Sequence, residues 1–425
     1  NAFVPSQTLT RRVIALHAQT HQQARPTTVS RMNGDIPSVP ALPTPSLLRR
    51  VQRLVAAALL AASIAAPAAV IIVGPDESVT RIADAARLAR DGDTVLIKPG
   101  TYRGDVAVWN QKSLEIRGLG TRPVLQADGR NAEGKAIWVF VNGHFKVDNI
   151  AFQGARVADG NGAGIRLEQG ALEVRNCSFE DNQNGILTAN FEDAELRVIN
   201  STFDKAPHDE LGLHHLLYVG RIKHFVLEGS RLQRGYLGHL VKSRARLSEV
   251  RYNLLADGPE GSASYELEFP EAGIAVVTGN VIAQSATSSN PVIVGYGAEG
   301  AHWPVNRLLL SHNTLINDGT HPAQFVRVWF ERLPDDTRVT TRNNLLAGPG
   351  SFVEAMPGDH QGNTRLPAGT PLPDSGWAGP QLAPVPSAAD SGLAPEAEFR
   401  FPAGTRQLAG RPRWLPGAVQ TAPAP

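Results

Sequence analysis

The sequence has a single cysteine, few charged residues and no excess of either charge. One Cys among 425 residues excludes an intramolecular disulfide framework and any Cys-rich metal site. The 41 Lys and Arg residues balance 40 Asp and Glu residues, so the global positive field of a nucleic-acid binder is absent. Charged residues make up 19% of the chain, below the average of about a quarter. Hydrophobic residues reach 42%, which excludes a wholly disordered chain.

Glycine and proline are abundant, with 40 Gly and 31 Pro, or 71 of 425 residues. A weakly charged chain of this composition needs many tight turns. The prolines concentrate toward the ends. We expect an unstructured extension at residues 1–45, and a Pro/Gly-rich segment at 357–425 that packs on the main fold or is disordered. Because the chain begins with Asn1, we expect a later natural translation start, at Met32 or Val51.

Residues 46–69 have the parts of a secretory signal peptide. Arg49, Arg50 and Arg53 form a basic flank, an apolar run covers residues 54–66, and small residues follow. The apolar run is too short for a permanent membrane span. We therefore expect export to the bacterial periplasm or secretion. An ordinary Ala/Leu helix and an uncleaved anchor are the alternatives.

Between residues 70 and 356 a short pattern recurs, in which Asn or Ser precedes an apolar stretch. Its anchors are Asn149, Asn176, Asn200, Ser230, Asn253, Asn280, Asn313 and Asn343. Repeats at intervals of roughly 20–35 residues are typical of solenoids. Stretches such as Tyr265–Phe269 alternate β-prone and polar residues, which predicts strands.

These features predict an all-β, single-domain right-handed parallel β-helix over residues 70–356. Asn can stack on Asn in adjacent coils and tolerates the left-handed backbone of a sharp corner. Helical periodicity occurs once, at residues 78–90, and predicts a helix that caps the open end of the solenoid. An antiparallel sandwich and a propeller are the alternatives, although a propeller would have a longer period.

Two segments carry a family resemblance. Residues 91–102, Asp-Gly-Asp-Thr-Val-Leu-Ile-Lys-Pro-Gly-Thr-Tyr, resemble the opening of the pectate-lyase-like β-helix superfamily. Residues 398–405 are similar to the closing segment of some of its members. The resemblance covers about residues 72–420 and implies the same β-helix fold.

Polar residues that can face outward cluster between positions 208 and 331. They are His208, Asp209, His214, His215, Tyr218, Arg221, His239, Lys242, Arg244, Tyr265, Glu266, Glu268, Tyr296, Glu299, Arg327, Trp329 and Glu331. With Val241 inward, strict alternation places Lys242 and Arg244 outward. The same alternation predicts that Glu266 and Glu268 point outward.

The segment around Lys242 resembles the chondroitinase B and alginate lyase family. Residues 240–243, Leu-Val-Lys-Ser, followed by residues 250–253, Val-Arg-Tyr-Asn, match a family strand and the corner after it. The resemblance implies that Lys242 is a Brønsted base. Residues 236–239 lack the family's Glu-x-Glu calcium pair, and Glu266 stands where the family has an Arg. No cofactor is firmly implied, and calcium binding stays open.

The residues themselves suit β-elimination from a uronic acid, which needs a carboxylate neutraliser, a base and an acid. Arg244 or Arg221 can neutralise the carboxylate through a guanidinium fork. Lys242 can be the base if it is neutral, which the nearby Arg244 favours. An adjacent Glu266 would favour the charged form, making Lys242 a carboxylate clamp.

The remaining roles follow from residue chemistry. Tyr218, His215 or His239 can donate the proton, and Tyr218 or a histidine takes over as base if Lys242 is a clamp. Substrate-binding candidates are Arg221, Glu266, Glu268, Tyr296, Arg327 and Trp329. The competing interpretation is a structural charge ladder on an exposed sheet.

We therefore predict an exported polysaccharide lyase, a carbon–oxygen lyase, that cleaves an acidic glycan. A monomer without nucleic-acid partners or a permanent membrane span is expected. One alternative is a non-catalytic glycan-binding or assembly β-helix of the cell envelope. Another is a uronan C5-epimerase, because residues 207–209, Pro-His-Asp, resemble part of an epimerase signature. No Asp cluster of the polygalacturonase type is present.

Overall fold

The computed structural model describes residues 68–209, 212–288, 290–352, 357–366, 385–386, 393–409 and 413–421, which belong to one compact unit. The expected extension at residues 1–45 and nearly all of the expected signal at 46–69 lie outside these ranges, as does much of 357–425. No helix among the described residues is long and apolar enough to cross a membrane.

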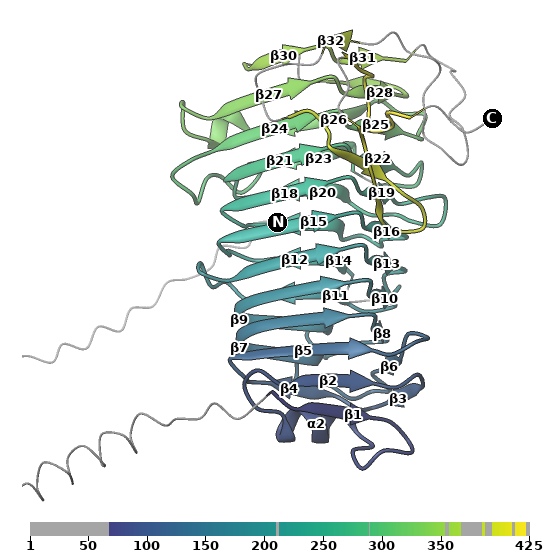
Figure 1. The fold of residues 1–425 in the computed structure, drawn as a ribbon. Coiled ribbons are helices and arrows are strands. Elements are labelled where there is room, and N and C mark those ends of the chain that lie inside the picture. The colour runs from purple at the N-terminus through teal and green to yellow at the C-terminus, as the bar shows by residue number, and fades with distance from the viewer. Residues whose placement is uncertain are drawn as a thin grey trace, which may run out of the picture. The chain divides into compact units, whose positions relative to one another are not determined.

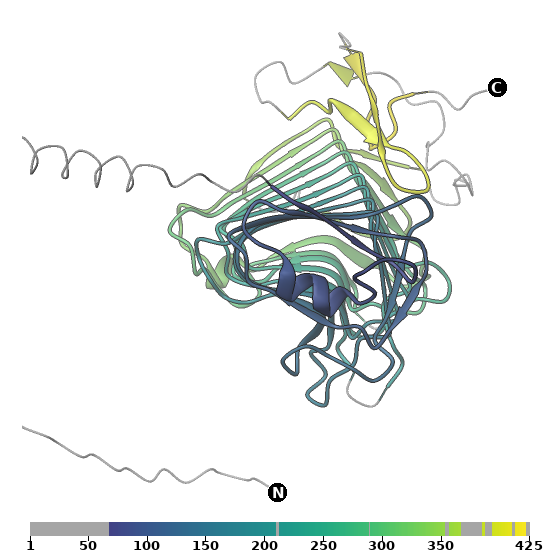
Figure 2. The same cartoon turned by 60° about the horizontal axis from the view of Figure 1, so that its bottom comes forward.

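The described chain is a right-handed parallel β-helix, as predicted, with three strand faces per coil (Figures 1 and 2). The first face contains β4 (Ala107–Trp109), β11 (Asn184–Thr188), β14 (His215–Val219), β17 (His239–Ser243), β20 (Tyr265–Phe269), β23 (Val292–Tyr296), β26 (Ala323–Val328) and β29 (Gly350–Ser351).

The second face follows the first in each coil. It contains β1 (Val70–Val73), β2 (Thr94–Ile97), β5 (Ser113–Gly118), β12 (Glu195–Ile199), β15 (His224–Glu228), β18 (Leu247–Arg251), β21 (Ile274–Thr278), β24 (Arg307–Ser311), β27 (Arg338–Arg342) and β30 (Asp359–Gln361). Two long strands, β7 (Ala136–Asp148) and β9 (Ala163–Arg175), run through both faces and join them into one 20-stranded sheet.

The third face is an 11-stranded parallel sheet. It contains β3 (Thr101–Arg103), β6 (Val124–Gln126), β8 (Ala151–Gln153), β10 (Ser178–Glu180), β13 (Thr202–Asp204), β16 (Arg231–Gln233), β19 (Leu254–Ala256), β22 (Val281–Gln284), β25 (Thr314–Asn317), β28 (Leu345–Ala347) and β31 (Thr364–Arg365). Short antiparallel pairs join β32 (Val385–Pro386) to β35 (Arg413–Trp414) and β33 (Ala397–Phe399) to β34 (Thr405–Gln407), and one 3-10 turn, η1, spans Phe330–Arg332.

The capping helix α2 spans Ile82–Leu88, shorter than the predicted 78–90. It starts late because Val79 bridges β1 at Val73, which keeps the preceding residues extended. The Asp105 carboxylate accepts hydrogen bonds from the first backbone N–H groups of the helix, including that of Ile82 at 2.6 Å. The helix thereby closes the N-terminal end of the core.

The Asn repeat marks a corner, but its members belong to two adjacent columns. Asn149, Asn176 and Asn200 have φ angles of 58°, 50° and 49° and make the left-handed turn. The next position points inward, and its column is Cys177, Ser201, Ser230, Asn253, Asn280, Asn313, Asn344 and Asn363. Along it, each backbone N–H donates to the next residue's side-chain oxygen at 2.8–3.2 Å. The ladder therefore joins successive coils inside the core.

The core stacks like residues on like residues. Phe152, Phe179 and Phe203 lie on consecutive third-face strands, with ring centroids 5.1 and 4.6 Å apart. The ladder residue Cys177 is buried, and burial raises the pKa of its thiol to about 12, so it is an inert core residue.

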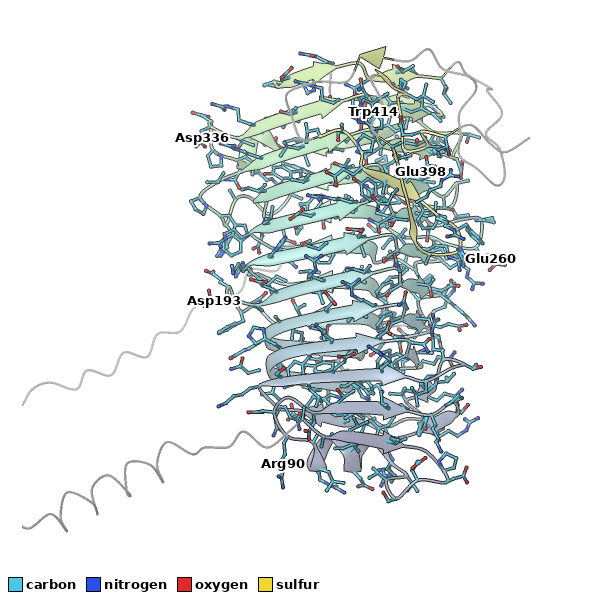
Figure 3. The ribbon with its side chains drawn as sticks, in the orientation of Figure 1. Arg90, Asp193, Glu260, Asp336, Glu398 and Trp414 are labelled. Carbon is cyan, nitrogen blue, oxygen red and sulfur yellow. The ribbon has the colours of Figure 1, made fainter. Side chains whose placement is uncertain are left out.

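The C-terminal segment packs against a corner of the solenoid. Ser311 Oγ donates to the carbonyl of Leu393 at 2.6 Å, and the backbone N–H of Ala418 donates to Thr314 Oγ1 at 3.0 Å. Glu398, labelled in Figure 3, is buried in this segment and accepts the backbone N–H of Gln420 at 2.7 Å. These contacts cover outward apolar side chains of the third face.

Strict alternation fails at one point in the first-face strands. Leu240 and Val241 both belong to the main core, as do Leu216 and Leu217 on the preceding strand. Two successive inward residues shift the alternation by one position. The residue in β20 at this point is Glu266, which the flanking register aligns with Leu240.

Two predicted site residues therefore point into the core. Glu266 has no exposed surface, and burial together with the neighbouring Asp257 raises the pKa of its carboxyl group well above the usual range. Tyr296 is also fully buried and donates to the carbonyl of Gly273 at 2.5 Å. The prediction that both face outward was wrong. For Glu266 it assumed that the strand alternates without interruption, whereas Tyr296 aligns with the core residue Phe269 on the preceding strand.

Candidate functional site

One outward column of the first face carries the candidate site. The strand register aligns, in order, Arg166, Leu187, Tyr218, Lys242, Glu268, Gly295 and Arg327. Neighbours in such a column lie about 4.8 Å apart. Lys242 is at its centre, with Tyr218 on one side and Glu268 on the other.

Two carboxylates flank Lys242. Its Nζ lies 3.6 Å from Glu268 Oε2 and 3.3 Å from Glu299 Oε1, and its side chain is 13% exposed. Glu268, not Glu266, is thus the acidic neighbour. The side chain is thus paired with two carboxylates, an arrangement that suits a cationic clamp better than a base.

Arg244 joins Tyr218, a proton-transfer candidate, to two glutamates. Its Nη2 lies 2.7 Å from both oxygens of Glu299, and its Nε lies 3.1 Å from Glu271 Oε1. Its Nη1 donates to the hydroxyl of Tyr218, and its guanidinium lies 5.2 Å from the centre of that ring. Arg244 is thus held on three sides.

Glu271 bridges two arginines from the protein side. Both of its oxygens accept hydrogen bonds from Arg221 at 2.6 Å, and it also pairs with Arg244. Its side chain is only 7% exposed. It was missed in the sequence because it lies in a turn after β20, outside the strand pattern.

His215 and His239 form a stacked pair beside this cluster. Their ring centroids are 4.6 Å apart, and the backbone N–H of His239 donates to His215 Nδ1 at 2.9 Å. Burial, with the charges of Lys242 and Arg244, lowers the pKa of His215 to about 3, and burial lowers that of His239 well below its usual value. Both rings are therefore neutral at neutral pH.

His239 also approaches Glu268. Its Nε2 lies 3.3 Å from Glu268 Oε2, and burial raises the pKa of that carboxyl group.

Tyr218 borders a hollow next to the cluster. Burial raises the pKa of its hydroxyl, whereas the charge of Arg244 opposes the rise. The hollow has a volume of about 680 Å³ and is lined by Arg166, His215 and Lys135 among others. A ligand lying there would contact Tyr218 and His215 together.

Arg327 and Trp329 lie farther along the same face. Arg327 is three strands from Lys242, or about 14 Å at the usual strand spacing. Its guanidinium is 5.0 Å from the centre of the Trp329 ring. A Cβ on Gly295 would lie 3.2 Å from the Tyr265 ring and 3.4 Å from Trp329, so this glycine leaves a space between two aromatic rings. Tyr265 is partly exposed here.

The residues of the epimerase-like motif pair with other side chains. His208 stacks on Tyr236 at 4.0 Å, and Asp209 lies 2.7 Å from Nε2 of the buried His214. These contacts give His208 and Asp209 structural partners at the start of the coil.

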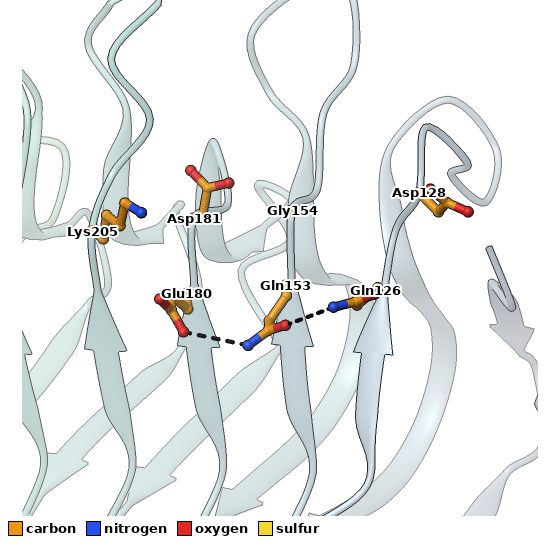
Figure 4. A pocket seen from close by; sticks show the side chains of 7 residues that line it. All are labelled: Gln126, Asp128, Gln153, Gly154, Glu180, Asp181 and Lys205. Carbon is orange, nitrogen blue, oxygen red and sulfur yellow. Dashed lines mark hydrogen bonds between the residues drawn. The ribbon is translucent and has the colours of Figure 1, made fainter. Parts of the chain in front are cut away.

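A second polar hollow lies on the third face (Figure 4). It has a volume of about 310 Å³, and Gln126, Gln153 and Glu180 form a hydrogen-bonded row across it, with successive distances of 3.3 Å. Lys205 is also in its lining. This row lacks the combination of arginine, tyrosine and histidine found on the first face. No group of three or more His, Cys, Asp or Glu residues suited to a metal ion occurs in the described part of the chain.

The structure thus brings together Lys242, Arg244, Tyr218, His215 and His239, with Arg221 and Glu268 beside them. Fold and site together define a right-handed parallel β-helix with a mixed-charge cluster on an outer sheet face.

Comparisons with known proteins place the fold. No protein-family model and no curated protein matches the sequence. Pectate lyase Pel9A is similar in structure, with a TM-score of 0.52 and 14% identity over 83% of this chain and 96% of that one. The PL6 family alginate lyase AlyGC gives 0.48 and 16% over 71% of this chain, which spans 40% of that lyase. The A-module of Azotobacter vinelandii mannuronan C-5 epimerase AlgE6 gives 0.32 and 15%, over 67% and 93%. The chain thus shares the parallel β-helix fold of this pectate lyase, as the resemblance of the opening segment implied.

Proposed function

We propose that the protein is a polysaccharide lyase that cleaves an acidic glycan by β-elimination on the first face. The observation that carries the proposal is the contact of Arg244 with Tyr218 beside Lys242. It joins two cations with a proton-transfer group at the edge of a hollow. The fold shared with a pectate lyase adds support.

The elimination removes the proton at C5 of a uronate, forms the C4–C5 double bond and breaks the bond from C4 to the glycosidic oxygen. The electron pair of the C5–H bond becomes the double bond, and the leaving oxygen gains a proton. Negative charge builds on the carboxylate in the transition state, so fixed cations there lower the barrier. Arg244 and Lys242 supply them.

Tyr218 is the proton-transfer group. As a phenolate stabilised by Arg244, it takes the C5 proton, and the hydroxyl so formed returns that proton to the leaving oxygen when both atoms lie on one side of the ring. His215 is a positioning residue: its Nδ1 accepts from the His239 backbone, so the proton of the neutral ring is on Nε2.

The test is incubation with a panel of acidic polysaccharides, followed by the ultraviolet absorbance of the unsaturated uronate product. Tyr218→Phe is the matched variant, because it removes only the hydroxyl. Absorbance from the wild type but not from Tyr218→Phe supports the proposal. Wild-type protein that produces no unsaturated ends from any polyuronide contradicts it.

A non-catalytic glycan-binding protein is the second candidate. It is favoured by the carboxylates that already pair with the cations of the site, since a self-neutralised surface resembles a structural charge ladder. It predicts polysaccharide retention without product, with a larger effect from Trp329→Ala than from Tyr218→Phe. A C5-epimerase shares the proton abstraction and is separated from both by the uronate composition of the recovered polymer.

We also propose export, based on the signal-like residues 46–69. N-terminal sequencing of protein recovered outside the cytoplasm should give a start between about residues 66 and 71, just beyond the apolar run. A mature N-terminus ahead of residue 54 contradicts this proposal.

A further inference from the structure

We propose that the Glu299 carboxylate occupies the place of the substrate's own carboxylate, so that binding exchanges one carboxylate for another on Arg244 and Lys242. The inference rests on the proposed function for its ligand, an acidic glycan. It adds a carboxylate of the protein that competes with the substrate for the two cations, and this competition determines which glycans the site binds.

The geometry of Glu299 is that of a bound ligand. Both of its oxygens lie 2.7 Å from Arg244 Nη2, and Oε1 lies 3.3 Å from Lys242 Nζ. The Glu299 side chain is 44% exposed, whereas those of Arg244 and Lys242 are 12% and 13% exposed. The carboxylate therefore reaches the two cations from the solvent side, the direction from which a glycan arrives.

The second carboxylate on Arg244 differs. Glu271 is 7% exposed and is held by two hydrogen bonds of 2.6 Å from Arg221. Removing it would leave the buried guanidinium of Arg244 with only the more exposed Glu299 as a counter-ion. Glu271 is thus the permanent counter-ion of Arg244, and Glu299 is the replaceable one, because it can turn into water.

The exchange needs no opening of the loop that carries Glu299. The backbone N–H of Glu299 donates to the Pro270 carbonyl at 2.7 Å, and Trp303 Nε1 donates to the Arg244 carbonyl at 3.0 Å. These bonds fix the main chain on either side. Rotation of the Glu299 side chain alone frees the site.

Selectivity follows from the exchange. A neutral sugar offers nothing to replace the Glu299 contacts, so Glu299 stays in place. A single uronate trades one ion pair for another at nearly equal free energy, so one carboxylate alone binds weakly. A polymer with a carboxylate on successive sugars binds because its other units contact the rest of the column, including Arg327.

The experiment measures binding of the full chain to alginate and polygalacturonate by calorimetry or affinity electrophoresis. Glu299→Gln keeps the shape and removes the competing charge. It should bind at least one polymer about 2- to 5-fold more tightly than wild type, the equivalent of one exposed ion pair. Glu195→Gln is the control, because Glu195 is 38% exposed and pairs with Lys223 on the second face, away from the column. The affinity of this control variant for the same polymers should differ from that of wild type by less than twofold.

The inference is overturned if Glu299→Gln binds both polymers no more tightly than wild type does. An equal gain in Glu195→Gln also overturns it, because that result would indicate a general charge effect. A gain that persists with carboxyl-reduced polymers also overturns it. Product formation is measured separately. Tighter binding of Glu299→Gln without any unsaturated product would support the carboxylate exchange and contradict the proposed lyase activity. Glu299→Ala repeats the measurement with a variant that cannot hydrogen-bond to Arg244.

Discussion

The backbone N–H of His239 donates to Nδ1 of His215 at 2.9 Å, and the two rings stack in nearly parallel planes, 8° apart. A backbone N–H can only donate, so His215 Nδ1 carries no proton. His215 is thereby fixed in one tautomer next to a proton-transfer site. The arrangement repeats the rule of the core, in which like residues stack along a column.

The first prediction concerns these rings. Burial lowers the pKa of His215 to about 3 in the folded protein, below its ordinary value near 6.5. The unfolded chain then binds more protons than the folded chain between these values, so stability is full above pH 6.5 and falls as the pH drops toward 3. Urea unfolding from pH 7 to 4 should show a weaker pH dependence in His215→Gln than in wild type. Nitrogen NMR should find Nδ1 unprotonated at pH 7, and a protonated Nδ1 would contradict the geometry.

The second prediction concerns Tyr218. Removing its hydroxyl by Tyr218→Phe should lower kcat by about 100-fold or more, the usual contribution of a general acid or base. Burial raises the pKa of this hydroxyl, so the phenolate fraction and the rate of the wild type should rise through the alkaline range. The pH–rate profile is the measurement. An optimum in the acidic range would rule out a phenolate base.

The third prediction separates the two roles of Lys242. A clamp needs only positive charge, whereas a base must lose its proton, which Arg does not do. Because two carboxylates surround Lys242, we expect Lys242→Arg to keep a measurable share of the activity and Lys242→Ala to lose most of it. Steady-state kinetics on one polymer compare the three proteins. If Lys242→Arg is as inactive as Lys242→Ala while both remain folded, the base role suggested by the family resemblance is favoured.

The fold was predictable because a solenoid repeats its signals. Several signals each mark a coil or an end independently of the others. They are the Asn and Ser corners, the segment at residues 91–102 and the capping helix. The exact column was not predictable, because Asn149 turns the corner whereas Asn253 points inward one position later. Either position accepts an Asn.

The site was predictable in its strand residues and not in its loops. Tyr218 and Lys242 share a column by simple register, so their proximity follows once the coils are aligned. Glu299 reaches Arg244 from 55 residues away through a loop whose path no periodicity describes. Glu266 was misplaced because β20 has two successive inward residues, Glu266 and Leu267. A glutamate next to a leucine has the hydrophobicity pattern of an ordinary alternating pair.

The last prediction concerns that glutamate. Glu266 lies at a core position that Leu240 fills on the preceding strand, and neither of its oxygens has a hydrogen-bond partner within the described residues. A buried polar group without a partner costs about 1–3 kcal/mol, so Glu266→Leu should stabilise the protein by about that amount. Its folded pKa is raised above the ordinary value near 4.5, so the stability it contributes is present below that pH and is lost as the pH rises toward the folded pKa. The advantage of Glu266→Leu should therefore grow from pH 4.5 upward in urea unfolding. Glu260→Gln is the control, because Glu260 is 73% exposed, and it should leave the curve nearly unchanged. If Glu266→Leu is less stable than wild type at every pH, the prediction that the Glu266 carboxyl group destabilises the core is wrong.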